Sequence, residues 1–247
     1  MFLGGLASWY CDGCKRDFST PEPDRTACID NWVAGVEDMF NTAASSTDIS
    51  KEIYKNLEDN KNITGGSVVK LTEIFDQLLY KRNEEKDNDN DEFTENFMNS
   101  TNSVIGSRTG WSEISNNDTK YKTVSSYLES LDFSAYLWAE KESLRSVCNE
   151  NKTFIYSHIS VITRVTGNSP NAAEEECFSF TGQGTICVPV EREDSTGNCN
   201  IFVASAVKTR EKIDQQDSFI FPSTTGKFFA SLYSEISLFY PDAVNVF

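Results

Sequence analysis

The sequence predicts an α+β protein in which helices come first and an antiparallel β unit follows. Residues 24–169 contain no proline, and apolar residues recur at helical spacing through most of this stretch. From Thr153 onward, apolar residues alternate with polar ones, which is the spacing of half-buried strands. A run of helices followed by a run of strands is typical of the α+β class.

The length and the charge of the chain limit its function. Its 247 residues are enough for one large domain or two small ones, each with a hydrophobic core. The 38 acidic and 22 basic residues give a net charge of −16, which opposes binding to nucleic acid and to anionic membranes. We therefore expect no nucleic-acid partner. No run of about 18 apolar residues occurs, so we expect no membrane span within the chain.

Three apolar stripes predict the first three helices. Asp48 is the candidate cap of the second helix, and the segment Gly65-Gly66-Ser67 ends one element and caps the next. The stripes consist of Trp32, Val33, Val36, Met39 and Phe40, of Ile49, Ile53, Tyr54 and Leu57, and of Val68, Leu71, Phe75, Leu78 and Leu79.

The acidic segment 83–92 separates these helices from the next ones. Its alternating aspartates resemble the start of a calcium-binding loop. An EF-hand loop needs glycine at its sixth position and glutamate at its twelfth, whereas this chain has Glu92 and Met98 there. We therefore predict a solvated linker. Helical spacing then resumes in two stripes, Phe93, Phe97 and Ile105, and Tyr121, Val124, Tyr127, Leu128, Leu131, Trp138 and Ala139.

A series of short segments predicts strands in the last hundred residues. The first covers residues 153–165 and places four β-branched residues on one face, namely Ile155, Ile159, Val161 and Val165. Further strands are expected at 176–181, 184–190, 199–207 and 217–221, and an apolar segment of mixed pattern covers 227–240.

Seven cysteines fall into two groups, three near the start and four in the last hundred residues. Cys11 and Cys14 have the spacing of a zinc or redox pair, but neither a second such pair nor a nearby histidine completes a metal site. Disulfide bonding is the better interpretation, and no metal or cofactor is expected. The partners of Cys11, Cys14 and Cys28 stay unassigned because spacing alone does not determine them.

The four later cysteines predict two disulfides. Cys187 and Cys199 flank the polar turn segment 191–197, so we expect them to face each other across a hairpin and to bond. Cys148 and Cys177 are then the default second pair. Other pairings remain open.

Four N-glycosylation motifs occur, at Asn62, Asn99, Asn117 and Asn151. Each lies in polar surroundings at the edge of a predicted segment, which is where a secreted protein needs its glycans to be. We expect these four residues to be glycan acceptors.

Other chemical motifs carry less weight. His158-Ile159-Ser160 has the order of a self-cleaving tripeptide, but it is predicted within a regular strand rather than in a strained turn. The segment Gly182-Gln-Gly184 is interpreted as a turn before a strand. The tryptophans are expected in the core rather than in a sugar-binding platform. With no base, nucleophile or metal constellation in view, we predict that the chain is not an enzyme.

Several motifs together resemble one family. Trp9-x-Cys11, Phe18-x-x-Pro21-x-Pro23-Asp24-x-x-x-Cys28 and Trp32 are similar to the end of the disulfide-rich hormone-receptor module of latrophilins. Residues 63–79, Ile-Thr-Gly-Gly-Ser-Val-Val-Lys-Leu-Thr-Glu-Ile-Phe-Asp-Gln-Leu-Leu, resemble the start of the helix that follows this module in the autoproteolysis-inducing (GAIN) domain of adhesion G-protein-coupled receptors. Trp111-Ser-Glu-Ile and residues 127–139 are similar to later helices of that domain, and the order of the motifs matches over nearly the whole chain.

The resemblance implies three parts. These are a remnant of the hormone-receptor-like disulfide module at 1–30, a helical GAIN subdomain at 31–145 and a partial β-sandwich GAIN subdomain at 146–247. The family's cleavage site resembles Cys-x-Cys-x-His-Leu-Thr/Ser, and the chain contains no such string. We therefore expect a sequence that is truncated before that site, with a tail at 234–247 that does not follow the family.

The resemblance also implies a place and a role. The chain is expected on the extracellular side of the plasma membrane, within a receptor whose signalling it controls mechanically or through a ligand, and it is expected to act in cell adhesion. The implied partners are an extracellular protein ligand on an adjacent cell and the attached seven-helix membrane domain. The alternative is a secreted adhesion or decoy module that binds a partner and signals nothing. Seven apolar spans downstream in the parent transcript would separate the two.

Overall fold

The computed structural model describes residues 22–59, 63–85, 90–143, 149–167, 175–180, 184–189, 199–207, 229–234 and 245–246. These residues form helices followed by antiparallel strands, so the predicted α+β class is confirmed. The chain divides into two compact units; within the described residues the first ends at Tyr127 and the second begins at Leu128. Each unit has buried apolar side chains of its own.

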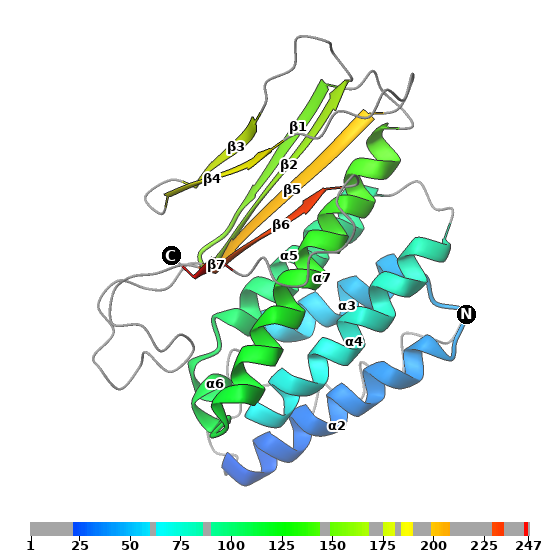
Figure 1. Ribbon diagram of the computed structural model, residues 1–247. Coiled ribbons are helices and arrows are strands. Elements are labelled where there is room, and N and C mark those ends of the chain that lie inside the picture. The colour runs from blue at the N-terminus through cyan, green and yellow to red at the C-terminus, as the bar shows by residue number, and fades with distance from the viewer. Residues whose placement is uncertain are drawn as a thin grey trace. The chain divides into compact units, whose positions relative to one another are not determined.

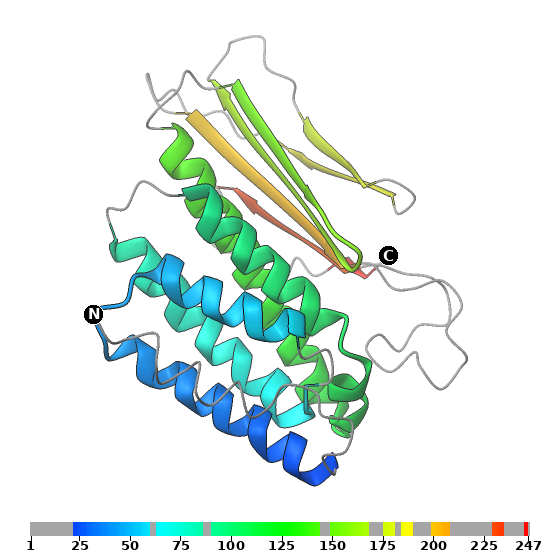
Figure 2. The same cartoon turned by 180° about the vertical axis from the view of Figure 1, so that it is seen from behind.

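The first unit is helical (Figure 1). Helix α3 packs against α5, as Figure 2 shows, and α4 contacts α2, α3 and α6. Helix α2 passes without a break through residue 30, where the resemblance placed a boundary between modules. The elements of this unit are α2 (Glu22–Phe40), α3 (Ser46–Asp59), α4 (Gly65–Glu84), α5 (Asn90–Ile105), α6 (Arg108–Glu113) and the first part of α7 (Asn117–Ser143).

The stripes predicted for the helices form the core of this unit. The Phe75 ring centroid lies 5.0 Å from that of Phe97 and 5.7 Å from that of Tyr127, so α4, α5 and α7 meet there. Met39, Phe40 and Tyr54, also predicted in stripes, are only half-buried. The stripe residues that are buried as predicted are Trp32, Val33, Val36, Ile49, Ile53, Leu57, Val68, Leu71, Phe75, Leu78, Leu79, Phe93, Phe97, Ile105, Val124 and Tyr127.

The starts of α3 and α4 differ from the predicted ones. Ser45 caps α3: its Oγ accepts a hydrogen bond from the Asp48 N–H at 3.1 Å, and the Asp48 carboxylate accepts one from the Ser45 N–H at 3.4 Å. Asp48 is thus at position N3 of a capping box, the third residue of the helix, and not the cap itself. Thr64 caps α4, with its Oγ1 accepting from the Ser67 N–H at 3.1 Å. The two glycines therefore lie inside the first turn of α4.

The ends of the predicted acidic linker belong to the helical structure. Helix α4 continues to Glu84 and α5 begins at Asn90, so less of the segment 83–92 is a linker than predicted. The Glu85 carboxylate accepts from the Ser46 N–H at 2.9 Å, at the start of α3. Glu92 Oε1 lies 2.8 Å from Lys51 Nζ of α3. Residues 86–89 lie outside the described part.

The second unit contains two antiparallel sheets in addition to residues 128–143 of α7 (Figure 1). The larger sheet has the strand order β1-β2-β5-β6-β7, and the smaller one pairs β3 with β4. The predicted strands 176–181, 184–190 and 199–207 correspond to β3, β4 and β5, whereas 217–221 lies outside the described residues. The strands are β1 (Asn149–Ile155), β2 (Ile159–Gly167), β3 (Glu175–Phe180), β4 (Gly184–Pro189), β5 (Cys199–Val207), β6 (Phe229–Ser234) and β7 (Asn245–Val246).

The predicted strand 153–165 is wrong as a single element, because the chain reverses within it. Strands β1 and β2 form a hairpin, and the Tyr156 N–H donates to the Ile159 carbonyl at 2.9 Å across the turn. Ile155 pairs with Ser160, so it lies on the face opposite to Ile159 and is 64% exposed. The other three predicted residues, Ile159, Val161 and Val165, are buried as expected.

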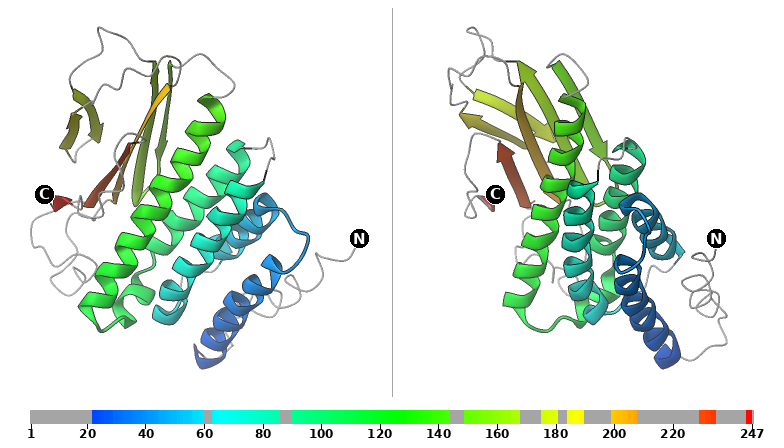
Figure 3. Two further views of the ribbon diagram at one scale, coloured as in Figure 1. Left: turned by 45° about the vertical axis from the view of Figure 1, so that its right-hand side comes forward. Right: turned by 90° about the vertical axis from the view of Figure 1, so that its right-hand side faces the viewer.

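Other elements lie on both faces of the larger sheet of this unit (Figure 3). On one face, the Trp138 ring of α7 packs edge-on against Phe154 of β1, with centroids 6.2 Å apart. On the other face, the Arg164 guanidinium carbon of β2 lies 4.9 Å from the Phe178 ring centroid of β3. The β3–β4 pair therefore lies on the face opposite to α7.

The tail 234–247 contains strand β7 and the last residue of β6. Strand β6 comes from the apolar segment 227–240, and β7 pairs with it through Phe229 opposite Val246 and Ala230 opposite Asn245. Strand β7, which belongs to the tail 234–247, therefore extends the larger sheet.

Candidate functional site

The candidate site is a groove of about 710 Å³ in the first unit. It is lined by the start of α4, the end of α6 and the segment that leads into α7. The motif residues Gly65 and Gly66 form one wall, and Glu113 and Ile114 form another. This groove was not predicted from the sequence, although both of the segments that form it carry motifs of the resemblance.

Two glycines allow the walls to approach each other. A Cβ on Gly65 would lie 2.9 Å from Glu113 Cβ and 3.0 Å from the Gly110 carbonyl oxygen. A Cβ on Gly110 would lie 2.6 Å from Val68 Cγ2 and 2.8 Å from the Ile63 carbonyl oxygen. Side chains at either position would force α4 and α6 apart, because contacts this close are repulsive.

The helix starts at the groove are capped from within the chain. Glu113 Oε2 accepts from the Gly65 N–H at 2.7 Å, which places a carboxylate at the positive end of α4. Asn116 Oδ1 accepts from the Thr119 N–H at 3.1 Å in the first turn of α7. Glu113 and Asn116 therefore stabilise the walls of the groove.

A buried cluster of Val68, Trp111 and Tyr127 joins α4, α6 and α7, the helices next to the groove. The Tyr127 hydroxyl donates to the Val68 carbonyl at 2.6 Å, and Trp111 Nε1 donates to the Val104 carbonyl at 2.9 Å. The two rings meet edge to face with centroids 6.2 Å apart, and both are fully buried. Burial, and secondarily the Asp76 carboxylate, raise the pKa of Tyr127 well above its ordinary value of 10.0. Tyr127 is therefore a neutral donor at physiological pH.

The exposed surface of the groove combines charged and apolar side chains. Lys70 Nζ lies 3.0 Å from Glu37 Oε1, and both side chains are partly exposed, so this ion pair is weak and can exchange partners. Glu73, one turn further along α4, is exposed. The groove thus presents charges of both signs beside apolar Val69. Among the residues that the structure describes, no cluster of three or more His, Cys, Asp or Glu side chains could hold a metal ion.

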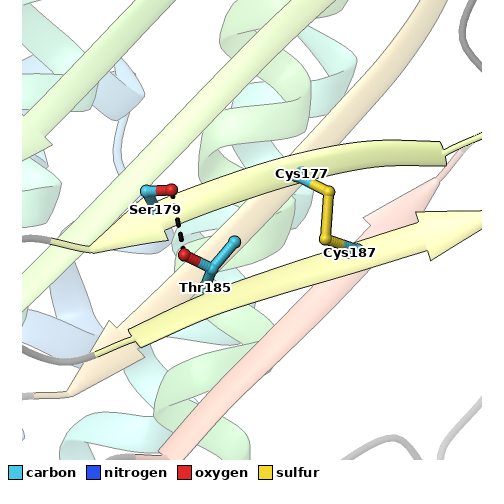
Figure 4. Close-up of a disulfide and its surroundings, with 4 residues drawn as sticks. All are labelled: Cys177, Ser179, Thr185 and Cys187. Carbon is cyan, nitrogen blue, oxygen red and sulfur yellow. Dashed lines mark hydrogen bonds between the residues drawn. A yellow bond between two sulfur atoms is a disulfide. The ribbon is translucent and has the colours of Figure 1, made fainter.

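The structure pairs Cys177 with Cys187, which corrects both predicted disulfides of the β unit (Figure 4). The two residues lie opposite each other on β3 and β4, with Cα atoms 4.0 Å apart. The predicted bond from Cys187 to Cys199 fails because β5 pairs with β2 and β6 rather than with β4. Cys177 is then not available to Cys148. Cys148, Cys11 and Cys14 lie outside the described residues.

The predicted glycan acceptors occupy different environments. Asn99 lies inside α5, and its Nδ2 donates to the Glu95 carbonyl at 2.9 Å, so the prediction that it stands at a segment edge is wrong. Asn151 lies in β1 and is exposed. Asn117 is the first residue of α7, and Asn62 lies outside the described residues.

The structure also shows where the predicted His-x-Ser motif and the tryptophans lie. His158 lies in the turn between β1 and β2 rather than within a strand, so that part of the argument against self-cleavage was wrong. Ser160, the hydroxyl of that motif, is 5% exposed in β2. Trp32, Trp111 and Trp138 are buried as predicted, with at most 5% exposed. Trp9 and most of the turn Gly182-Gln-Gly184 lie outside the described residues.

In comparisons with known proteins, no protein-family model matches the chain, and no curated protein matches it. In the part of the chain that the structure describes, the helices are too short or too polar to cross a membrane.

Proposed function

We propose that the chain is a non-enzymatic extracellular region of a latrophilin-like adhesion receptor. In this proposal the helical unit binds a protein ligand on an adjacent cell, and the β unit couples that contact to an attached seven-helix membrane domain. The alternative is a secreted adhesion or decoy module with the same binding surface. Both use the groove at the start of α4 as a contact surface.

One observation carries this proposal: three of the segments that resemble the family meet in one place. Val68 comes from residues 63–79, Trp111 from the Trp-Ser-Glu-Ile motif, and Tyr127 begins residues 127–139. The hydrogen bond from Tyr127 to Val68 and the edge-to-face contact of Tyr127 with Trp111 join them. Motif residues that are far apart in sequence and pack together are what a shared helical domain requires.

The arrangement of the two sheets in the β unit also supports this proposal. We infer that the larger sheet and the β3–β4 pair are the two layers of a β-sandwich subdomain, since Phe178 of β3 packs against Arg164 of β2. A sandwich of antiparallel strands can hold a further strand through main-chain hydrogen bonds, which is the coupling that the proposed control of signalling requires.

The binding function is tested with purified chain against a panel of cell-surface and secreted ectodomains. Lys70→Glu combined with Glu73→Lys reverses the charges at the groove without changing its net charge. We expect this variant to lose about ten-fold in affinity for the ectodomain that the wild type binds, or about 1.4 kcal/mol. Tyr80→Ala is the matched control, because Tyr80 lies on the same helix, is 65% exposed and is not among the groove residues. Equal losses in both variants would overturn the groove as the contact surface.

The receptor and decoy proposals predict different coding sequences downstream of this chain in the parent transcript. A receptor requires seven apolar segments of about 20 residues downstream of the coding sequence for this chain. A stop codon without such segments would overturn the receptor proposal and leave the decoy.

A further inference from the structure

Strand β1 is an edge of the larger sheet, since among the described strands it pairs only with β2. The free N–H and C=O groups of an edge strand are a template for pairing with another chain. Proteins often protect such an edge with lysine, but Lys152 Nζ lies 4.9 Å from the Trp138 ring centroid and 5.0 Å from that of Phe154. This lysine therefore covers aromatic rings on the α7 side.

The opposite row of β1 carries no charge. It consists of Asn151, Thr153 and Ile155, which alternate with Lys152 and Phe154 along the strand and are all exposed. Ile155 is 64% exposed, one of two large apolar side chains with such exposure among the described residues. A neutral row that ends in an exposed isoleucine invites pairing with a second copy of the chain.

Two residues of this row, Asn151 and Thr153, belong to the glycosylation motif Asn151-Lys152-Thr153. In an extended strand, residues two positions apart point to the same side, so the Asn151 amide and the Thr153 hydroxyl share one exposed surface. We propose that Asn151 carries an N-linked glycan and that this glycan keeps the β1 edge and Ile155 from pairing with a second copy of the chain. This inference rests on the proposed extracellular location, because the glycan is added in the secretory pathway.

From this chain the transfer needs the Asn151 amide, and the Thr153 hydroxyl for recognition of the motif. An oligosaccharide linked to a lipid pyrophosphate is the donor. A bond forms between Asn151 Nδ2 and C1 of the first sugar, the bond from C1 to the pyrophosphate oxygen breaks with its electron pair leaving on the lipid pyrophosphate, and the proton lost by the amide balances the new charge on that leaving group. Asn151 and Ile155 lie four residues apart, or roughly 13 Å along the strand, which is within the span of a branched oligosaccharide.

The motif at Asn99 serves as an internal contrast. The Asn99 Nδ2 atom, which would have to accept the sugar, donates to the Glu95 carbonyl within α5. The hydroxyl residue of that motif, Thr101, is fully buried and donates to the Phe97 carbonyl at 3.0 Å. A motif held in this way is a poorer acceptor than an exposed one on an extended strand. We therefore expect the glycan on Asn151 and not on Asn99.

Site occupancy is tested on the full chain secreted from eukaryotic cells. Enzymatic deglycosylation in heavy-oxygen water marks each occupied asparagine for mass spectrometry, and the expected result is a marked Asn151 and an unmarked Asn99. Marking of Asn62 or Asn117 without Asn151 would overturn this inference and leave the extracellular proposal standing. If all four are unmarked, both fail. Thr153→Ala should abolish the mark at Asn151, whereas Thr153→Ser should retain it.

The protective role is tested by light scattering on the secreted chain. Asn151→Gln should shift the protein from monomer toward dimers or larger species as concentration rises, with Asn99→Gln as the matched control that stays like the wild type. Adding Ile155→Lys to Asn151→Gln should restore the monomer, because it places a charge in the same exposed row. An Asn151→Gln variant that stays monomeric at every concentration would overturn the protective role.

Discussion

Tyr127 is the residue that joins the α4, α6 and α7 segments at the candidate site. Its pKa is raised by burial, so the unfolded chain loses this proton at lower pH than the folded chain does. The stability from Tyr127 is therefore fully present below pH 10.0, its ordinary pKa, and falls as pH rises above that value. Its hydrogen bond to Val68 adds about 1 kcal/mol at neutral pH.

Tyr127→Phe should lower the free energy of unfolding by about 1 kcal/mol at pH 7 and flatten its decline above pH 10. Urea unfolding at a series of pH values measures both effects. The control is Tyr80→Phe: the hydrogen bond to Glu84 also raises the pKa of Tyr80, but Tyr80 is 65% exposed, so its removal should change the decline less than removal of the buried Tyr127 hydroxyl. A decline of equal steepness in wild type and Tyr127→Phe would show that another group causes it.

Thr163 shows the opposite case, a buried hydroxyl that costs stability. It is fully buried in β2, and its Oγ1 has no hydrogen-bond partner among the described residues. Because an unsatisfied buried hydroxyl is unfavourable and valine has the same shape, Thr163→Val should raise the free energy of unfolding by about 1 kcal/mol. Thr101→Val is the matched control, since the buried Thr101 hydroxyl donates to the Phe97 carbonyl and its removal should not stabilise. Destabilisation of Thr163→Val in thermal or urea unfolding would refute this account.

At the scale of elements, the approach of α4 to α6 depends on Gly110. Gly110→Ala should cost roughly 1–3 kcal/mol, because the added methyl group would press against Val68 and the Ile63 backbone. Gly35→Ala in α2 is the control: nothing lies within 4 Å of the added Cβ, so the helix should gain about 0.5–1 kcal/mol. Chemical unfolding of the two variants should move in opposite directions. A Gly110→Ala variant as stable as the wild type would mean that the helices separate without cost.

The β3–β4 pair depends on its disulfide, since a two-stranded sheet is marginally stable alone. Peptide mapping without reduction should recover Cys177 joined to Cys187, ten residues apart. Replacing both cysteines by serine should lower the stability by about 2–3 kcal/mol, the value expected for closing so short a loop. Recovery of Cys187 joined to Cys199 would instead restore the hairpin that the sequence suggested.

The larger differences between expectation and structure, in strand pairing and in the groove, share one cause, which is distance along the chain. The helical stripes were predictable because the spacing that places Phe75 and Leu79 on one face is set within a few residues. The pairing of β5 with β2 was not predictable, because a polar turn between Cys187 and Cys199 looks the same whether or not the flanking strands pair. The groove was missed for the same reason, since the approach of Gly65 to Gly110 joins segments that are far apart in sequence.

At the scale of the whole molecule, the division between the units falls within α7. The resemblance placed it at residue 145, whereas residues 128–143 group with the strands. Trp138 of this part packs on Phe154, on the same face of the sheet as the buried Val161 and Val203. The β unit therefore needs this part of α7 to cover its apolar face, and a fragment that starts after the helix exposes that face to water.

The fragment 128–247 should accordingly unfold with a single sharp thermal transition, whereas 146–247 should aggregate and bind the hydrophobic dye ANS. Trp138→Ala in the fragment 128–247 tests the contribution of one side chain of α7. It removes the indole that covers Phe154, and it should lower the free energy of unfolding by roughly 3–5 kcal/mol, as truncation of a buried aromatic side chain does. Calorimetry and dye fluorescence on the three proteins measure this directly. If 146–247 melts sharply as a monomer without binding the dye, the sheet is stable without the helix, and the division belongs at residue 145 after all.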